Sequence, residues 1–159
     1  INLDRNKNNK LDYILIEGEQ THFDAVRRTN GFLENSQNLP LNQLTNLSAD
    51  WQRNLSSVKF SKLDTSIIQS AEAIICNNDD MALGAWEALE EKGCTEVQVV
   101  GIDGIEEVRE LVDEDKILGS VLCDTKLHAK ALMQFIDVLA FHNGSVEKLN
   151  LENERLNSV

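Results

Sequence analysis

The feature that most constrains this chain is a regular alternation between short apolar, β-branched runs and longer segments with helical apolar spacing. The run Tyr13-Ile14-Leu15-Ile16 ends near Gly18, and apolar residues then follow at helical intervals. The same succession recurs along most of the chain. Strands that alternate with helices of about ten to fifteen residues favour a parallel sheet with right-handed crossovers. We therefore expect an α/β fold, a doubly wound parallel sheet with helices on both faces.

The expected elements have ordinary start and stop signals. Gly93 follows the strongest helical segment and is typical of a helix carboxyl terminus. The segment 38–48 is ambiguous, and we interpret it as a strand with its entry loop. The predicted strands are 13–16, 71–76, 97–102 and 118–122, and the predicted helices are 23–36, 50–60, 79–92, 105–113 and 125–142.

Polar side chains follow several of the predicted strands, at the point where each strand ends. His22 and Asp24 come after the first strand, and Asn78 and Asp103 come after two later ones. Ligands of an open parallel sheet collect outside the carboxyl ends of its strands. Carboxylates, amides and an imidazole can together match the many hydroxyl groups of a sugar, and each unmatched buried hydroxyl is costly.

These residues also have structural interpretations that the sequence leaves open. Asn78 or Asp79 would cap the helix that follows, which is worth about 1 kcal/mol. Thr21 and Asp24 have the spacing of a capping box. Asp24 and Arg28 have the i,i+4 spacing of a solvated salt bridge.

Asp103 and Trp51 are less easily explained by helix capping. Gly104 follows Asp103 directly, so no capping requirement is evident there. Trp51 lies near the start of a predicted helix. Its ring would either join the core or cover the apolar face of a sugar.

The amino-terminal segment carries a second pattern, in which oxygen-bearing side chains alternate along the chain. Their oxygens fall at positions 1, 3, 5, 7 and 9 of an EF-hand-like loop. The twelfth position is apolar, so a bidentate carboxylate would have to come from elsewhere in the chain. An asparagine-rich turn ahead of a strand is the alternative. The loop residues are Asp4, Asn6, Asn8, Lys10 (through its carbonyl) and Asp12.

The charge balance and the motifs that are lacking argue against several classes of protein. The formal net charge is -12 at pH 7, which disfavours nucleic acid as a partner because phosphates would be repelled. No run approaches the roughly 20 apolar residues of a membrane-spanning helix. Phosphate-binding glycine loops and the nucleophile elbow of hydrolases are absent, so we do not expect an enzyme.

Taken together, the motifs resemble the periplasmic galactose/glucose-binding proteins over roughly residues 4–142. The most specific part is the loop pattern joined to the H-x-D-x-x-x-R run that starts at His22. The N-N-D-x-M-A-x-G segment from Asn77 and the G-x-D segment from Gly101 are shared more widely. Cores of LacI-type transcription regulators also carry such segments.

The resemblance implies a role for each candidate residue. Five side chains would hydrogen-bond a monosaccharide, Trp51 would stack on one of its faces, and Glu72 would supply the carboxylate that the calcium loop lacks. The implied hydrogen-bonding residues are His22, Asp24, Arg28, Asn78 and Asp103. The implied calcium ligands are Asp4, Asn6, Asn8, Lys10, Asp12 and Glu72.

Two departures from the family pattern bear on specificity and affinity. Cys123 stands where the family has an amide, and a thiol is a poor donor and acceptor, so one sugar hydroxyl would be unmatched or the specificity changed. Asn8 stands where the family prefers aspartate, which lowers the charge around the ion and with it the expected calcium affinity.

The family is a two-lobed receptor that closes on a monosaccharide and delivers it to an ABC transporter permease or a chemoreceptor. The resemblance assigns residues 1–123 to the carboxy-terminal lobe, and residues 124–159 to a crossover helix and polar tail that belong with a missing amino-terminal lobe. We expect a periplasmic or lipid-anchored receptor outside the cytoplasmic membrane. The alternative is the effector-binding core of a LacI-type regulator. One lobe supplies one wall of the site, so this chain alone should bind sugar weakly.

Overall fold

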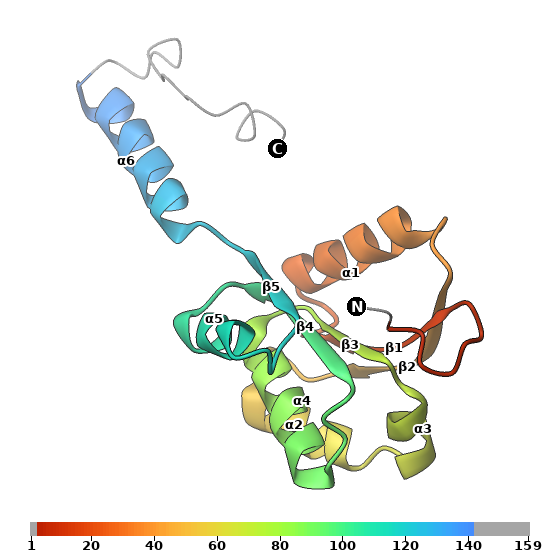
Figure 1. The fold of residues 1–159 in the computed structure, drawn as a ribbon. Helices are drawn as coiled ribbons and strands as arrows, with labels where there is room; N and C mark the ends of the chain where they lie inside the picture. The colour runs from red at the N-terminus through yellow and green to blue at the C-terminus, as the bar shows by residue number, and fades with distance from the viewer. Residues whose placement is uncertain (1–2, 142–159) are drawn as a thin grey trace. The chain divides into compact units, whose positions relative to one another are not determined.

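A five-stranded, wholly parallel sheet organises the first of the two units into which the chain divides, Ile1–Leu122. The structure, a computed structural model, describes residues 3–141. The strand order is β2-β1-β3-β4-β5, so the direction of winding reverses between β1 and β3 (Figure 1). The strands are β1 (Leu11–Glu17), β2 (Leu41–Ser48), β3 (Ala73–Cys76), β4 (Gln98–Asp103) and β5 (Gly119–Leu122).

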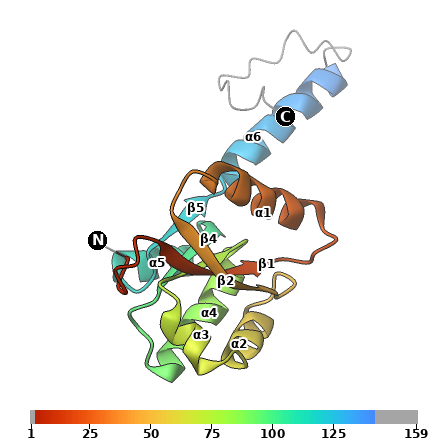
Figure 2. The ribbon, with the colours of Figure 1, turned by 90° about the vertical axis from the view of Figure 1, so that its right-hand side faces the viewer.

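Helices cover both faces of the sheet, with α1 on one face and α2, α3 and α4 on the other (Figures 1 and 2). They are α1 (Phe23–Ser36), α2 (Arg53–Ser61), α3 (Thr65–Ser70), α4 (Asp79–Lys92) and α5 (Glu106–Asp113). The predicted doubly wound parallel α/β fold is thereby confirmed. Within residues 3–141, every helix is too short or too polar to cross a membrane.

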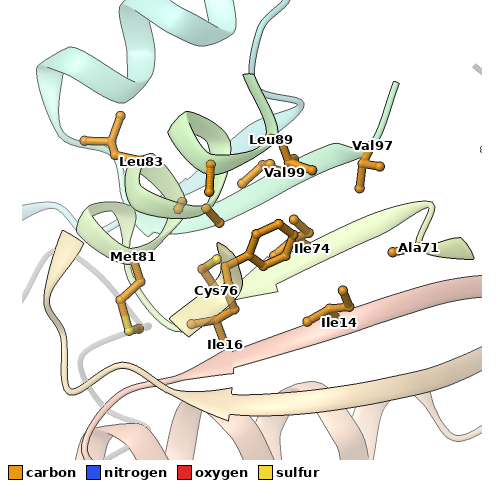
Figure 3. Close-up of a cluster of buried hydrophobic side chains, with 14 of the residues drawn as sticks. Ile14, Ile16, Ala71, Ile74, Cys76, Met81, Leu83, Leu89, Val97 and Val99 are labelled. Atoms are coloured by element: carbon orange, nitrogen blue, oxygen red, sulfur yellow. The ribbon is translucent and has the colours of Figure 1, made fainter. Parts of the chain in front are cut away.

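Strand β1 shows why a buried central strand appears in the sequence as an unbroken apolar run. Ile14 and Ile16 face the larger core, which α2, α3, α4 and α5 complete (Figure 3). Tyr13 and Leu15 face the other way, where Phe32 of α1 packs against them. Because both faces are covered, the strand lacks the alternation of polar and apolar residues that a half-exposed strand would show.

The structure corrects some of the predicted boundaries. The helix expected at 50–60 begins only at Arg53, because Asp50 and Trp51 form a turn with positive φ of 49° and 66°. The ambiguous segment ahead of it forms β2, and the short helix α3 was not predicted. Gly93 ends α4 in the left-handed conformation with φ of 67°, as its position predicts.

The second unit, Cys123–Val159, contains the helix α6 (Thr125–Phe141). The backbone N–H of Leu127 donates to Asp124 Oδ1 at 2.9 Å, which caps the start of this helix. The polar tail predicted after it lies outside the described residues, and the assignment of 124–159 to a missing lobe stays a prediction. Six large apolar side chains of α6 are exposed, those of Leu132, Met133, Phe135, Ile136, Leu139 and Phe141.

Helices α2 and α4 make a close approach where α4 has a glycine. A Cβ added to Gly84 would lie 2.0 Å from the carbonyl oxygen of Arg53 and 3.0 Å from the Cβ of Ser56. The buried hydroxyl of Ser56 donates to the Met81 carbonyl at 2.7 Å, which also joins the two helices. Gly31, inside α1, has no atom within 4 Å of the corresponding position.

We predict opposite effects for the same substitution at these two glycines. Gly84→Ala would press a methyl group against backbone atoms, so it should lower the free energy of unfolding by about 1–3 kcal/mol. Gly31→Ala meets open space and reduces the entropy of the unfolded chain, so it should raise that energy by about 0.4–1 kcal/mol. Urea unfolding of both variants beside the wild type measures the two effects. A Gly84→Ala protein as stable as Gly31→Ala would contradict the close approach of the helices.

Candidate functional site

The candidate site lies at the carboxyl end of the sheet, around the point where the winding reverses. The chain leaves β1 toward one face and β3 toward the other, which opens a crevice outside the strand ends. An open cavity of about 260 Å³ lies there. It is lined by His22, Asp24, Arg28, Trp51, Asn78 and Asp103. The structure thus gathers around one cavity the six residues singled out from the sequence.

An ion pair joins helix α1 to the end of β4 at this cavity. Arg28 Nη2 lies 3.1 Å from Asp103 Oδ1, with side chains 26% and 31% exposed. Arg28 Nη1 also donates to the backbone carbonyl of Asn77 at 2.6 Å. Within the described chain, the ion-pair partner of Arg28 is therefore Asp103, across the site, and not Asp24 on its own helix.

Asp103 occupies a strained and partly desolvated position. Its φ is 132°, in a region that residues with a side chain rarely adopt and that costs about 1–3 kcal/mol. Burial raises the pKa of the Asp103 carboxyl, the Arg28 guanidinium lowers it, and the charges of Asp79 and Asp80 raise it further. The net shift is upward, so the folded chain tolerates the ionised carboxylate less well than water does.

His22 combines a structural role with a place at the cavity. It is the N-cap of α1, and its Nδ1 accepts the backbone N–H of Asp24 at 3.2 Å. The capping box proposed for Thr21 is therefore replaced by a cap one residue later. Because Nδ1 is the acceptor, the neutral imidazole carries its proton on Nε2, which can donate to a ligand. The ring also stands edge-on to Trp51, with ring centroids 5.4 Å apart.

The indole of Trp51 is held in place by its backbone and by a glycine. The positive φ at Trp51 turns the chain out of β2, and a Cβ on Gly18 would lie 2.4 Å from the indole ring. The guanidinium carbon of Arg28 lies 5.5 Å from the ring centroid, within range of a cation–π interaction. In the described part of the chain, its Nε1 is buried without a hydrogen-bond partner. The residue is thus fixed as a flat apolar surface.

Asn78 caps the helix that follows it, as one of the structural interpretations proposed. Its Oδ1 accepts the backbone N–H of Met81 at 3.0 Å. Its Nδ2 lies 3.5 Å from the carbonyl oxygen of Trp51, at the upper limit for a hydrogen bond. Capping uses one of the two lone pairs of the amide oxygen, and the amide nitrogen remains a donor for a ligand.

Asn77 supports the site from behind, a role that the sequence analysis did not assign to it. Its buried Oδ1 accepts the backbone N–H of Gly18 at 3.1 Å and the hydroxyl of Thr29 at 3.2 Å. Its carbonyl accepts from Arg28, as described above. One residue thereby ties the end of β1, helix α1 and the end of β3 together. The available signal was its position directly after a buried strand, ahead of two further polar residues.

The predicted metal loop lies ahead of β1, with Glu72 beside it. The Nδ2 atoms of Asn6 and Asn8 donate to Asp12 Oδ2 at 2.7 and 3.1 Å. The backbone N–H of Asn8 donates to Asp4 Oδ1 at 3.1 Å. Glu72 is buried and accepts the backbone N–H groups of Asn6 at 3.2 Å and Asp12 at 3.0 Å. The structure therefore joins these predicted ligands in one hydrogen-bonded network.

The oxygen atoms of this loop suit a hard cation, but in the structure they accept hydrogen bonds from within the chain. All the predicted ligands offer oxygen, which favours calcium over zinc. Within residues 3–141, however, no three His, Cys, Asp or Glu side chains converge closely enough to hold a metal ion. A bound ion would have to displace the amide hydrogen bonds around Asp12. Calcium therefore stays a prediction.

The Asp12 carboxylate is stabilised by those amides. Burial raises its pKa, and hydrogen bonds from Asn42, Asn6 and Asn8, together with the charge of Lys10, lower it. The net shift is downward, so the ionised form is favoured in the fold. The backbone N–H of Lys10 donates to Asn8 Oδ1 at 2.7 Å, which completes the turn.

Comparison with known proteins gives the chain a family. The model of the periplasmic binding protein domain matches residues 2–143. The chain belongs to this family. It is a family of binding proteins, which agrees with the expectation that the chain is not an enzyme.

Two relatives carry the names of sugar-binding proteins. The chain is 33% identical over 148 residues to the D-galactose/methyl-galactoside binding periplasmic protein MglB of Haemophilus influenzae, which covers 91% of this chain and 44% of that protein. It is 32% identical over 112 residues to the D-allose-binding periplasmic protein of Escherichia coli, which covers 67% of this chain and 35% of that one. The chain thus spans less than half the length of either relative.

A solved structure has the same fold. An ABC transporter solute binding protein from Burkholderia multivorans matches with a TM-score of 0.72 at 22% identity. The match covers 87% of this chain and 49% of that one. The fold of this chain is therefore the fold of one part of such a protein.

We predict that ionisation of Asp103 makes the chain less stable as the pH rises. A raised pKa means that the folded chain holds this proton more tightly than the unfolded chain. Stability is therefore lost as the pH rises from the ordinary carboxyl value, about 4, through the raised value. Asp103→Asn should remove this loss, so the variant should gain stability relative to the wild type between about pH 3 and pH 7. Urea unfolding of both proteins at these two pH values measures the difference in their free energies of unfolding. A wild type that gains stability relative to Asp103→Asn as the pH rises would contradict the prediction.

Proposed function

We propose that this chain is a monosaccharide-binding lobe of a solute receptor and that the six cavity residues contact the sugar. One observation carries the proposal. The residues singled out from the sequence come from α1, the loop after β2, the start of α4 and the end of β4, and they line a single cavity. Membership of the periplasmic binding protein domain family supports the same function.

The chemistry of the cavity suits a sugar. Asp24 and Asp103 offer carboxylate acceptors, and Arg28 and the Nε2 of His22 offer donors. Trp51 offers a flat apolar surface for the C–H face of a sugar ring. Each well-formed hydrogen bond is worth about 1 kcal/mol, so several are needed for useful affinity.

The relatives narrow the proposed ligand and partner. The names of the two relatives include galactose and allose, which are hexoses, so we propose a hexose such as galactose or glucose for this chain. The receptor would act in the periplasm, or anchored outside the cytoplasmic membrane, and would pass its sugar to an ABC transporter permease or a chemoreceptor. The names of these relatives support a receptor over the core of a transcription regulator.

Titration of the nitrogen-15-labelled chain with galactose and glucose tests the sugar site. We expect amide shifts around the cavity and a dissociation constant on the order of millimolar, because one lobe satisfies only part of a sugar. Arg28→Ala should abolish these shifts. Arg27→Ala is the matched control, since the Arg27 guanidinium lies over the Phe23 ring, 4.4 Å from its centroid, and Arg27 is not among the cavity residues. The proposal fails if no sugar moves the cavity signals, or if Arg28→Ala and Arg27→Ala behave alike.

We further propose that the amino-terminal loop binds calcium through oxygen atoms of the six predicted ligands. The support is that Glu72, far away in the sequence, lies against the loop and accepts two of its backbone N–H groups. An ion there would link the loop to the start of β3. The proposed ligands are Asp4, Asn6, Asn8, Lys10, Asp12 and Glu72.

Thermal unfolding with and without calcium tests the loop. Calcium added to the chelator-treated chain should raise the melting temperature, and a concentration 100 times the dissociation constant would stabilise the fold by about 2.7 kcal/mol. Glu72→Gln should remove most of this effect, whereas Glu91→Gln on the exposed side of α4 should leave it intact. A wild-type melting temperature that ignores calcium would mean that the asparagine hydrogen bonds alone hold the loop.

A further inference from the structure

We propose that Asp79 is a positioning residue for the Asp103 carboxylate, acting through the turn that carries Asp103. The inference rests on the proposed function, in which Asp103 contacts the sugar. Asp79 itself is fully buried at the start of α4 and does not line the cavity.

The carboxylate of Asp79 holds the turn on both sides. Its Oδ2 accepts the backbone N–H of Ile105 at 2.9 Å. Its Oδ1 accepts the hydroxyl of Ser120 at 2.6 Å, and the Ser120 oxygen accepts the backbone N–H of Gly104 at 3.0 Å. The two residues that follow Asp103 are therefore both tied to Asp79, one directly and one through Ser120.

This turn needs restraint from outside. Asp103 and Gly104 both have positive φ, 132° and 70°, and a side chain at position 104 would meet Leu122 Cδ1 at 2.7 Å. Strained backbone of this kind persists only where the surrounding structure fixes it. If the N–H groups of Gly104 and Ile105 lost their acceptors, the turn would relax and the Asp103 carboxylate would move away from Arg28.

Strand β4 is shaped to admit the Asp79 carboxylate. A Cβ added to Gly101 would lie 2.1 Å from Asp79 Oδ1 and 3.2 Å from the Cβ of Ala82. The glycine of the G-x-D segment thus makes room for Asp79, and the aspartate of the same segment is the residue that Asp79 positions. The same buried carboxylate is therefore connected with both the glycine and the aspartate of that motif.

Helix capping does not account for Asp79. Asn78 is the N-cap of α4, and both hydrogen bonds described for Asp79 come from outside the helix. An acidic residue in the first turn of a helix gains its favourable interaction with the helix dipole while exposed to water. Full burial of a carboxylate is costly unless specific partners satisfy it. Those partners are the backbone N–H of Ile105, in the turn after Asp103, and the hydroxyl of Ser120 in β5, which itself accepts from that turn.

The pH titration of the Asp103 carboxyl, followed by carbon-13 NMR in the full chain, tests the proposal without any sugar. In the wild type, the midpoint of the Asp103 titration should lie above the ordinary pKa of an aspartate side chain. Ser120→Ala removes the link to Gly104, so the Asp103 carboxyl should become solvated and the midpoint of its titration should fall toward the ordinary value of an aspartate. Ser120→Thr keeps the hydroxyl and should restore the wild-type midpoint.

Ser56→Ala is the matched control for a purely structural effect. It removes another serine hydrogen bond of the same unit, the one to the Met81 carbonyl, so it should lower the melting temperature and leave the Asp103 midpoint unchanged. Ser120→Ala should also weaken galactose binding about five- to tenfold, and Asp79→Asn should act in the same direction.

The outcomes separate this inference from the proposed function. A Ser120→Ala protein with the wild-type midpoint, or with wild-type galactose affinity, overturns the positioning role of Asp79. A midpoint that falls in Ser120→Ala and returns in Ser120→Thr supports that role even where no sugar binds. In that last case the positioning of Asp103 stands and the sugar ligand is wrong.

Discussion

Between β1 and β3 the chain turns to opposite faces of the sheet, with α1 covering one face and α4 the other. The loops that leave these two strands must therefore diverge, which leaves a crevice outside the strand ends. Asn77 holds this junction together by accepting from Gly18, Thr29 and Arg28. The cavity, the ion pair to Asp103 and the place of the Trp51 indole all depend on this divergence. A parallel sheet with one winding direction would have no such crevice.

The parts of the molecule that sequence could predict are those fixed by local pattern. The apolar run of β1, the helix that Gly93 ends and the alternation of elements follow from burial and from helix stop signals. The expectation that ligands collect at strand ends then indicated His22, Asp24, Asn78 and Asp103 without any knowledge of distances, since all strands point the same way. The resemblance to the galactose/glucose-binding proteins added Arg28 and Trp51. Asp103 could be singled out because Gly104 follows it, so Asp103 is not needed to cap a helix.

The rest depends on contacts between distant positions, which spacing cannot show. Asp79 meets Ser120 across 41 residues, and Arg28 meets the Asn77 carbonyl across 49. The turn at Trp51 requires a positive φ that no local signal marks, because neither it nor Asp50 is a glycine. In each case the energy that fixes the conformation comes from another element of the fold, so the local sequence alone leaves the outcome open.

Two carboxylates show how the fold separates stability from binding. Asp12 lies at the amino end of the sheet, where amide donors surround it and lower its pKa. Asp103 lies at the carboxyl end, where burial outweighs its single guanidinium partner and raises its pKa. The first is surrounded by amide donors within the chain, whereas the second has the Arg28 guanidinium as its ion-pair partner and is otherwise desolvated by burial. Sugar hydroxyl groups would supply further donors, and hydrogen bonds to the ionised form favour it. Under the proposed function, part of the binding energy therefore comes from satisfying a carboxylate that the fold itself leaves poorly solvated.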